Sequence, residues 1–209
     1  MAKETLAVAV LGAGNIGGTL GKKWSAVGHK VRFGVNDPTG KHAQALRAEL
    51  GELAVIGTIE DALQGNPDVV LIALPGGTVE STVQNYAAQL NGRIIIDAAN
   101  RMGEDAMHSL TSFQQYTPQA QIYRAFNSLG WENFAEPIFD GIQADLFYCG
   151  PDGATRTKVE QLISDVGLRP MYLGGSEQMA LLDSIASLWF TLALGQKKGR
   201  HLAFKVLGV

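Results

Sequence analysis

The sequence predicts an α/β fold in which helices cover both faces of a doubly wound, mostly parallel sheet. Strand-like and helix-like segments alternate along the 209 residues, which is the pattern of repeated strand–helix–strand units. The stretch Val69–Leu74 is apolar at every position, as expected of a strand that is buried on both faces. A glycine-rich turn, Gly12–Gly17, joins the first apolar strand to the first amphipathic segment.

Composition and charge limit the classes of function. The formal net charge is −3 and the chain has no basic tract, so we expect no nucleic-acid partner. Cys149 is the sole cysteine, which excludes an intrachain disulfide and fits a reducing compartment. The apolar run Leu6–Leu11 is too short for the core of a signal peptide, so we expect a cytoplasmic protein.

The length predicts a single domain over residues 1–209, with a C-terminal helical segment over about 177–209 that packs on the domain or on a partner. The stretch Met179–Leu194 is mostly apolar but contains Asp183, and it is shorter than the roughly 20 residues that span a bilayer. We therefore expect no membrane span. A core position and a subunit interface both fit this helix, and its apolar surface favours a homodimer.

Eight short apolar segments are predicted as strands. They are Leu6–Leu11, Lys30–Val35, Leu53–Ile56, Asp68–Leu74, Arg93–Asp97, Gln121–Ala125, Asp145–Cys149 and Arg169–Leu173.

Local signals mark the ends of the helices. The first helix has one apolar stripe, formed by Ile16, Leu20, Trp24 and Val27. It ends at Gly28, a residue type that commonly follows the last helical turn. Thr58 and Asp61 have the spacing of a capping box. Asp37-Pro38 predicts the cap and first position of the second helix.

The glycine turn is the strongest functional motif. Its sequence is Gly12-Ala13-Gly14-Asn15-Ile16-Gly17, directly after a strand and at the start of a helix. Gly12 permits the tight turn, Gly14 lets a pyrophosphate approach the backbone, and Gly17 lets the helix pack against the sheet. Free N–H groups of this turn, including those of Asn15 and Ile16, then face the phosphates. The motif predicts a Rossmann-type dinucleotide site, and a turn without a ligand is the alternative.

The end of the second predicted strand should meet the adenosine ribose. Asp37 follows Gly17 by 20 residues, the spacing of the acid that binds ribose hydroxyls in NAD enzymes. The capping role is equally compatible with this residue. Asn36 lies nearby, and Lys41 and His42 could meet a 2′-phosphate, although a lysine at such a place is more often a solvated surface charge.

Three later strand ends should open on the same crevice, because ligands bind at the carboxyl ends of such strands. Leu74 and Pro75 would supply apolar contacts with the cofactor. Asn100, Asn127 and Ser128 are neutral hydrogen-bonding groups suited to a nicotinamide amide or to a redox partner, although such residues also form ordinary turns.

The sequence shows neither a nucleophile with its base nor the spacing of a metal site, so we expect no catalytic side chain and no metal. Hydride transfer between two bound cofactors needs alignment of two rings and little acid–base assistance.

Several segments together resemble the NADP oxidoreductases that depend on the deazaflavin coenzyme F-420. They are Leu11–Gly18, Ala73–Pro75, Ile96–Asn100, Arg124–Ser128, Phe139–Gly141, Leu188–Trp189 and Ala203–Lys205. The resemblance implies direct hydride transfer between nicotinamide and deazaflavin, usually in a homodimer. It also implies that the segment Phe204–Leu207 closes over the nicotinamide.

One departure concerns the dinucleotide. Family members commonly have Ser-Arg after the second strand, where this chain has Val35-Asn36. Asn36 can donate a hydrogen bond but lacks the charge of arginine. The family match still favours NADP(H), with NAD possible.

We therefore expect an NAD(P)-dependent oxidoreductase with coenzyme F-420 or a flavin as its redox partner. The alternatives are an NADPH-dependent flavin or ferric reductase, and a non-catalytic sensor of NADP(H).

Overall fold

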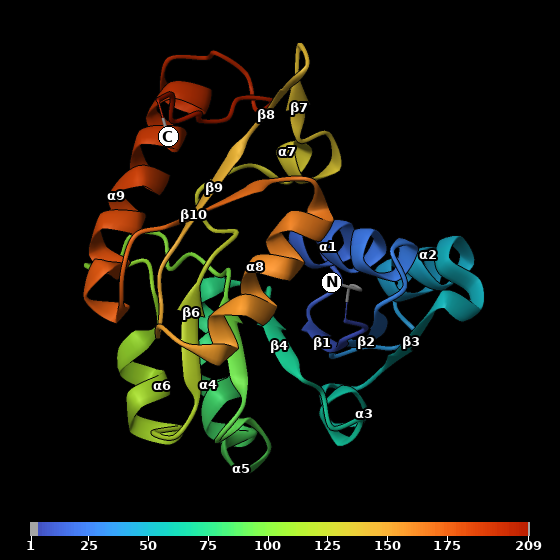
Figure 1. Ribbon diagram of the computed structural model, residues 1–209. Helices are drawn as coiled ribbons and strands as arrows, with labels where there is room; N and C mark the ends of the chain where they lie inside the picture. The colour runs from blue at the N-terminus through green and yellow to red at the C-terminus, as the bar shows by residue number, and fades with distance from the viewer. Residues whose placement is uncertain (1–3, 209) are drawn as a thin grey trace.

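The computed structural model describes residues 4–208, and its centre is a parallel sheet of six strands (Figure 1). They are β1 (Ala7–Leu11), β2 (Lys30–Gly34), β3 (Ala54–Gly57), β4 (Val69–Ile72), β5 (Ile94–Asp97) and β6 (Gln121–Arg124). The strand order is β3-β2-β1-β4-β5-β6, so the direction of winding reverses beside β1. Open α/β sheets bind ligands at this reversal, at the carboxyl ends of the strands. The predicted fold class is confirmed.

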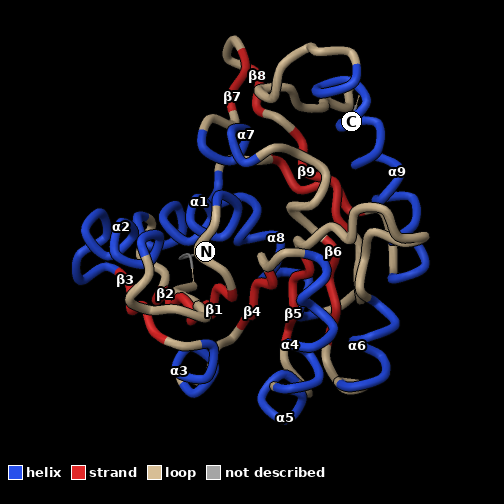
Figure 2. Tube along the Cα trace, turned by 180° about the vertical axis from the view of Figure 1, so that it is seen from behind, coloured by secondary structure: helices blue, strands red, loops and turns tan. Residues whose placement is uncertain are grey.

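Helices cover both faces of the sheet. They are α1 (Asn15–Ala26), α2 (Lys41–Leu50), α3 (Ile59–Gln64), α4 (Val79–Asn85), α5 (Ala87–Leu90), α6 (Leu110–Tyr116), α7 (Trp131–Ala135), α8 (Ala154–Val166) and α9 (Met179–Phe190). Short 3-10 turns occur at Gly51–Leu53, Gly76–Thr78 and Ser176–Gln178. Helices α1 and α2 lie on one side of β1–β3 and α3 lies on the other (Figures 1 and 2).

Two hydrophobic clusters explain why β1 and β4 are apolar throughout. Val8 and Val10 of β1 belong to the cluster under α1, α2 and α8, whereas Ala9 and Leu11 belong to the cluster under α3 and α4. Successive residues of a strand point to opposite faces, so a strand covered on both sides has no place for polar residues.

Helix α1 fits its predicted stripe except at one end. Leu20 and Trp24 are fully buried, and Gly28 follows the helix with a φ of +97°, as predicted. Val27 is wrongly predicted as part of the stripe, because its side chain lies past the last turn and is 49% exposed.

The second helix does not begin at Asp37-Pro38, so that prediction is wrong. Helix α2 begins at Lys41 after Gly40. The carboxylate of Asp37 instead accepts hydrogen bonds from the N–H of Thr39 at 2.9 Å and from its hydroxyl at 2.7 Å. This local turn occupies the side chain that would otherwise cap the helix. The predicted capping box of Thr58 and Asp61 is present.

The last two predicted strands stand apart from the central sheet. β9 (Asp145–Tyr148) and β10 (Arg169–Tyr172) form a separate parallel pair. A hairpin of β7 (Ile138–Phe139) and β8 (Ile142–Gln143) precedes them and was not predicted. Its turn residues, Asp140 and Gly141, both have positive φ, which is the Asp-Gly signal of a two-residue hairpin.

The C-terminal segment is helical only in its first part. After α9 the chain forms a π-helical turn, Thr191–Gly195. Residues 196–208 contain no helix, so the predicted helical segment 177–209 ends early. The continuous helical stretch Ser176–Gly195 has 20 residues and by length and composition could cross a membrane, contrary to the expectation from length. Its Leu182, Ala186 and Trp189 are buried in this fold, as in a core helix. The single-domain organisation stays a prediction.

Candidate functional site

The glycine turn is shaped by close backbone contacts. Gly12 has a φ of +105°, and a Cβ at this position would collide with the carbonyl oxygen of Ala73 on the neighbouring strand end. A Cβ on Gly17 would collide with the carbonyl oxygen of Gly12 and would lie 3.1 Å from Cγ1 of Val10. These two glycines therefore set the path of the turn and the approach of α1 to β1.

Gly14 differs from both, because no protein atom lies within 4 Å of the position of its Cβ. It precedes α1, whose first turn has neither a side-chain cap nor an acidic residue. The first N–H groups of this helix are thus left for an anion in the open space beside Gly14.

A cavity of about 590 Å³ lies over this turn and extends to the end of β2. It brings together nine of the predicted residues, namely Gly12, Gly14, Asn15, Ile16, Asn36, Asp37, Lys41, Leu74 and Pro75. Gly17 does not line the cavity, because it lies where α1 packs against the end of β1.

Two opposite charges occupy the β2 end of this cavity. Asp37 and Lys41 are the charged side chains among its lining residues. The hydrogen bonds from Thr39 hold the pKa of Asp37 below its ordinary value, so its carboxylate stays ionised. The side chain of His42 lies outside the described part of the structure. This end offers one anion for ribose hydroxyls and one cation for a phosphate.

A second crevice of about 230 Å³ continues from the first past Ile16, Leu74 and Pro75, which line both. The remaining lining residues are Ala73, Gly76, Ala98, Ala99, Asn100, Phe126, Asn127, Leu129, Gly130, Trp189, Phe190 and Arg200. Asn100 and Asn127 are therefore brought to one place, as predicted from the strand ends.

Asn127 is the clearest sign of a ligand in this crevice. It is only 3% exposed, yet neither its amide nitrogen nor its amide oxygen has a hydrogen-bond partner among the described residues. Buried amides are normally satisfied. The preceding Phe126 has a φ of +61°, a strained conformation for a bulky residue, held by edge contacts with Trp24 and Phe134. The backbone is thus fixed in the unusual shape that precedes this unsatisfied amide.

A buried arginine organises the ends of β5 and β6. Arg124 is fully buried and lies 3.2 Å from a carboxylate oxygen of Asp97 and 2.9 Å from one of Asp183 in α9. Burial raises the pKa of Asp97, and the Arg124 charge and the N–H groups of Ser109 and Ala99 oppose that rise. This network joins the sheet to α9.

The same arginine orients Asn100. Arg124 Nη2 donates to Asn100 Oδ1 at 2.7 Å, and Asn100 Nδ2 donates to the carbonyl oxygen of Asn127 at 2.9 Å. No role was predicted for Arg124, Asp97 or Asp183. The available signals were an arginine at the end of an apolar strand and an aspartate within an apolar helix.

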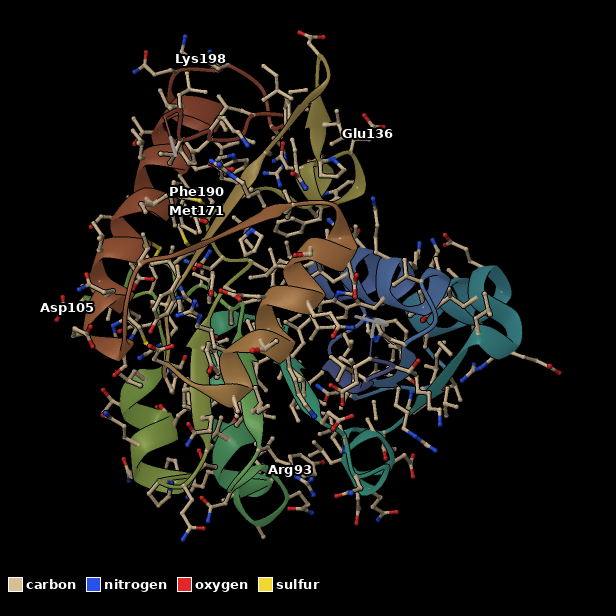
Figure 3. All side chains as sticks on the ribbon, in the orientation of Figure 1. Arg93, Asp105, Glu136, Met171, Phe190 and Lys198 are labelled. Carbon is tan, nitrogen blue, oxygen red and sulfur yellow. The ribbon has the colours of Figure 1, made fainter. Side chains whose placement is uncertain are left out.

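The far wall of the crevice comes from the C-terminal region. Trp189 and Phe190 of α9 and Arg200 of the following segment line it, and Figure 3 shows Phe190 on the inner side of α9. None of the three was predicted. The implied closure by Phe204–Leu207 is not seen in the described chain. Phe204 pairs instead with Asp145 at the start of β9, because the Asp145 N–H donates to its carbonyl oxygen at 2.9 Å.

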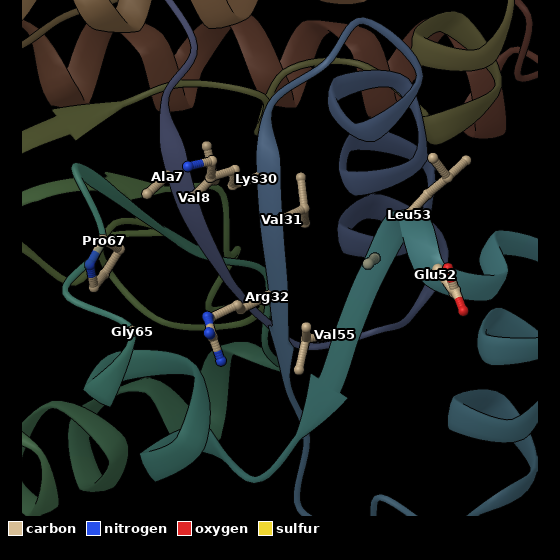
Figure 4. A pocket seen from close by; sticks show the side chains of 11 residues that line it. Ala7, Val8, Lys30, Val31, Arg32, Glu52, Leu53, Val55, Gly65 and Pro67 are labelled. Carbon is tan, nitrogen blue, oxygen red and sulfur yellow. The ribbon is translucent and has the colours of Figure 1, made fainter.

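A separate cavity of about 320 Å³ lies at the opposite, amino ends of β1–β3 (Figure 4). Arg32, Leu53 and Val55 are among its lining residues, and none of the predicted site residues is. Its position is not that at which open α/β sheets bind nucleotides. Within residues 4–208 no cluster of three metal-binding side chains occurs.

Comparison with known proteins agrees with this geometry. Residues 7–101 match the family described as "NADP oxidoreductase coenzyme F420-dependent". A glycerol-3-phosphate dehydrogenase [NAD(P)+] of Pseudomonas syringae pv. syringae (strain B728a) is 24% identical over 127 residues, which cover 55% of this chain and 37% of that relative.

Two solved structures share the fold. A protein of Arthrobacter sp. FB24, described as a candidate F420-dependent NADP reductase, has a TM-score of 0.80 at 22% identity, over 96% of this chain and 99% of that one. An imine reductase variant of Myxococcus stipitatus, in complex with NAD+, has a TM-score of 0.68 at 16% identity, over 93% and 62%. The matched family and the glycerol-3-phosphate dehydrogenase are both described as acting with NAD(P), and the chain spans about a third of the dehydrogenase's length.

Proposed function

We propose that this protein transfers a hydride between NADP(H) and a deazaflavin or flavin-like acceptor, because residues 7–101 match the family of coenzyme F420-dependent NADP oxidoreductases. The observation that carries the proposal is the pair of joined cavities, one at the N-terminus of α1 and one at the unsatisfied amide of Asn127. An extended dinucleotide would lie across both, with Leu74 and Pro75 beneath its middle.

Each end of the site has a task in this reaction. The N–H groups beside Gly14 bind the pyrophosphate, and Asn127 hydrogen-bonds the carboxamide of the nicotinamide. Leu129, Trp189 and Phe190 exclude water from the ring. Bound NADPH supplies the hydride. Since Arg200 is the only ionisable residue among those lining the crevice, the site favours an acceptor that needs no proton donor there.

The choice of NADP(H) rests on the family and on Lys41, which could meet a 2′-phosphate. Asp37 would favour NADH at the same place, so both nucleotides are to be measured. We further propose a cytoplasmic homodimer that acts on small molecules without nucleic acid or a membrane. A reductase of free flavin or of a ferric chelate and a non-catalytic NADP(H) sensor are the competing functions.

The test is anaerobic stopped-flow oxidation of NADPH and NADH carrying deuterium at the reactive carbon, with oxidised coenzyme F-420 and, separately, with free flavin. We expect deuterium to appear on the deazaflavin, and we expect Asn127→Ala to slow turnover about tenfold, or ~1.4 kcal/mol. Asn91→Ala, which removes an amide outside the crevice, is the control. Flavin reduction without transfer to the deazaflavin would favour the flavin reductase, and no turnover with any acceptor would favour the sensor.

A further inference from the structure

The crevice at Asn127 has one charged wall residue. Its lining consists of apolar side chains, glycines and the amides Asn100 and Asn127, with Arg200 as the exception. A guanidinium that opens on an otherwise neutral crevice offers charged N–H donors to a ligand there, and the ligand group that matches such donors is an anion.

Arg200 is held in place through its backbone. Asn133 Nδ2 donates to the carbonyl oxygen of Arg200 at 3.0 Å, and Trp189 Nε1 donates to the carbonyl oxygen of Leu202 at 2.7 Å. Asn133 is fully buried and Trp189 is 2% exposed. The segment is thereby fixed against α7 and α9 in the described structure, although it belongs to neither helix.

The guanidinium is only partly engaged. Its Nε and Nη2 donate to the two carboxylate oxygens of Glu132, at 2.5 and 3.3 Å, while Nη1 has no hydrogen-bond partner among the described residues. The group lies 5.4 Å from the centre of the Trp189 ring, and the side chain is 44% exposed. A Cβ on Gly130 would lie 2.6 Å from Glu132 Oε2 and 2.8 Å from Trp189 Cζ2, so glycine makes room for this arrangement.

We propose that Arg200 selects the acceptor by binding a phosphate or carboxylate attached to its redox-active ring. This inference rests on the proposed function, because it assigns the acceptor to the crevice beside the nicotinamide. Glu132 compensates the arginine while the site is free, and Nη1 remains available to the incoming anion.

The anion in question is not the pyrophosphate of the dinucleotide. That group belongs at the N-terminus of α1, and Arg200 does not line the larger cavity there. The nicotinamide end of the dinucleotide has no further anionic group once the pyrophosphate is placed. The partner of Arg200 therefore belongs to the second substrate.

FMN and riboflavin provide the test, because they share one ring and differ by one phosphate. Fluorescence titration of the NADP+-bound protein gives the Kd of each flavin, and steady-state assays with NADPH give kcat and KM. We expect FMN to bind more tightly than riboflavin, and we expect Arg200→Gln to weaken FMN about tenfold with little effect on riboflavin. Arg200→Lys should restore part of the difference, and Glu132→Gln should strengthen FMN binding.

Lys198→Gln is the matched control. It removes a positive charge from the same segment, and Lys198 lies outside the crevice and points outward (Figure 3). This variant should leave both flavins unchanged. Equal Kd values for FMN and riboflavin in the native protein, or an equal effect of Arg200→Gln on both, would overturn the inference. Selective FMN binding without NADPH oxidation would instead support Arg200 and reject the proposed hydride transfer.

Discussion

Gly14 and Gly17 lie three residues apart in one turn, yet a side chain has opposite consequences at the two positions. Gly14→Val should fold normally, because the space around its Cβ is open, but the branched side chain would occupy the place of the pyrophosphate. We expect calorimetric titration to show at least a tenfold weaker Kd for NADPH, about 1.4 kcal/mol.

Gly17→Ala is the matched control for that experiment. Its methyl group would collide with the carbonyl of Gly12 inside the protein, so the expected loss is in the melting temperature. A Gly14 variant that binds NADPH with unchanged affinity would show that the turn does not hold the cofactor.

The roles of single residues can be predicted from the sequence where they depend on residues nearby in the chain. The glycine turn is local, so its shape follows from its pattern. The position of Asn127 in the crevice could also be predicted from the sequence, because the end of a parallel strand opens on the crevice. The roles of Arg124 and Arg200 could not be predicted, because their partners Asp183 and Glu132 lie 59 and 68 residues away in the sequence. No spacing rule connects residues that are brought together only by the completed fold.

At the scale of elements, Asp145 fastens the C-terminal segment to β9. The buried carboxylate accepts from Arg169 at 2.6 and 2.8 Å, from Lys205 at 3.1 Å and from the N–H of Val206 at 2.6 Å. Burial acts to raise the pKa of Asp145, but these hydrogen bonds and charges outweigh it and lower the pKa below 3.8.

A carboxyl group with a lowered folded-state pKa contributes stability above its unfolded pKa and loses it as the pH falls through the folded value. We expect the stability supplied by Asp145 to be complete at neutral pH and to decline only below about pH 4. Denaturant unfolding of the native protein and of Asp145→Asn between pH 7 and pH 3 measures it. The two curves should converge in acid, and a constant gap would contradict the assignment.

Sequence patterns predict the ends of some elements correctly and fail at others. The capping box at Thr58 was predicted because both partners lie within one turn. Asp37-Pro38 carried the same type of signal but failed, because Thr39 offered the carboxylate a nearer partner. The hairpin at Asp140-Gly141 was missed because its strands have only two residues each, too few for an alternating pattern.

At the scale of the whole molecule, one face of α9 leaves an apolar strip uncovered. The strip consists of Leu181 and Leu188, which lie seven residues apart and are each 49% exposed. We predict that this strip forms a homodimer interface, because removal of such a surface from water is favourable. Sedimentation velocity at micromolar concentration should show a dimer, and Leu188→Arg should shift it toward a monomer. A native monomer would leave the strip as ordinary surface.

Contacts between the region of α1 and α8 join residues that lie far apart in the chain, so they form late in folding. The indole of Trp24 donates to the carbonyl oxygen of Leu162 at 2.9 Å across 138 residues, and His29 lies 2.8 Å from Asp165 across 136. These pairings cannot form until most of the polypeptide has left the ribosome. A nascent chain that ends soon after the glycine turn would expose Trp24 to solvent and to other chains. Long-range closure of this kind predicts slow folding, with the nucleotide site completed late.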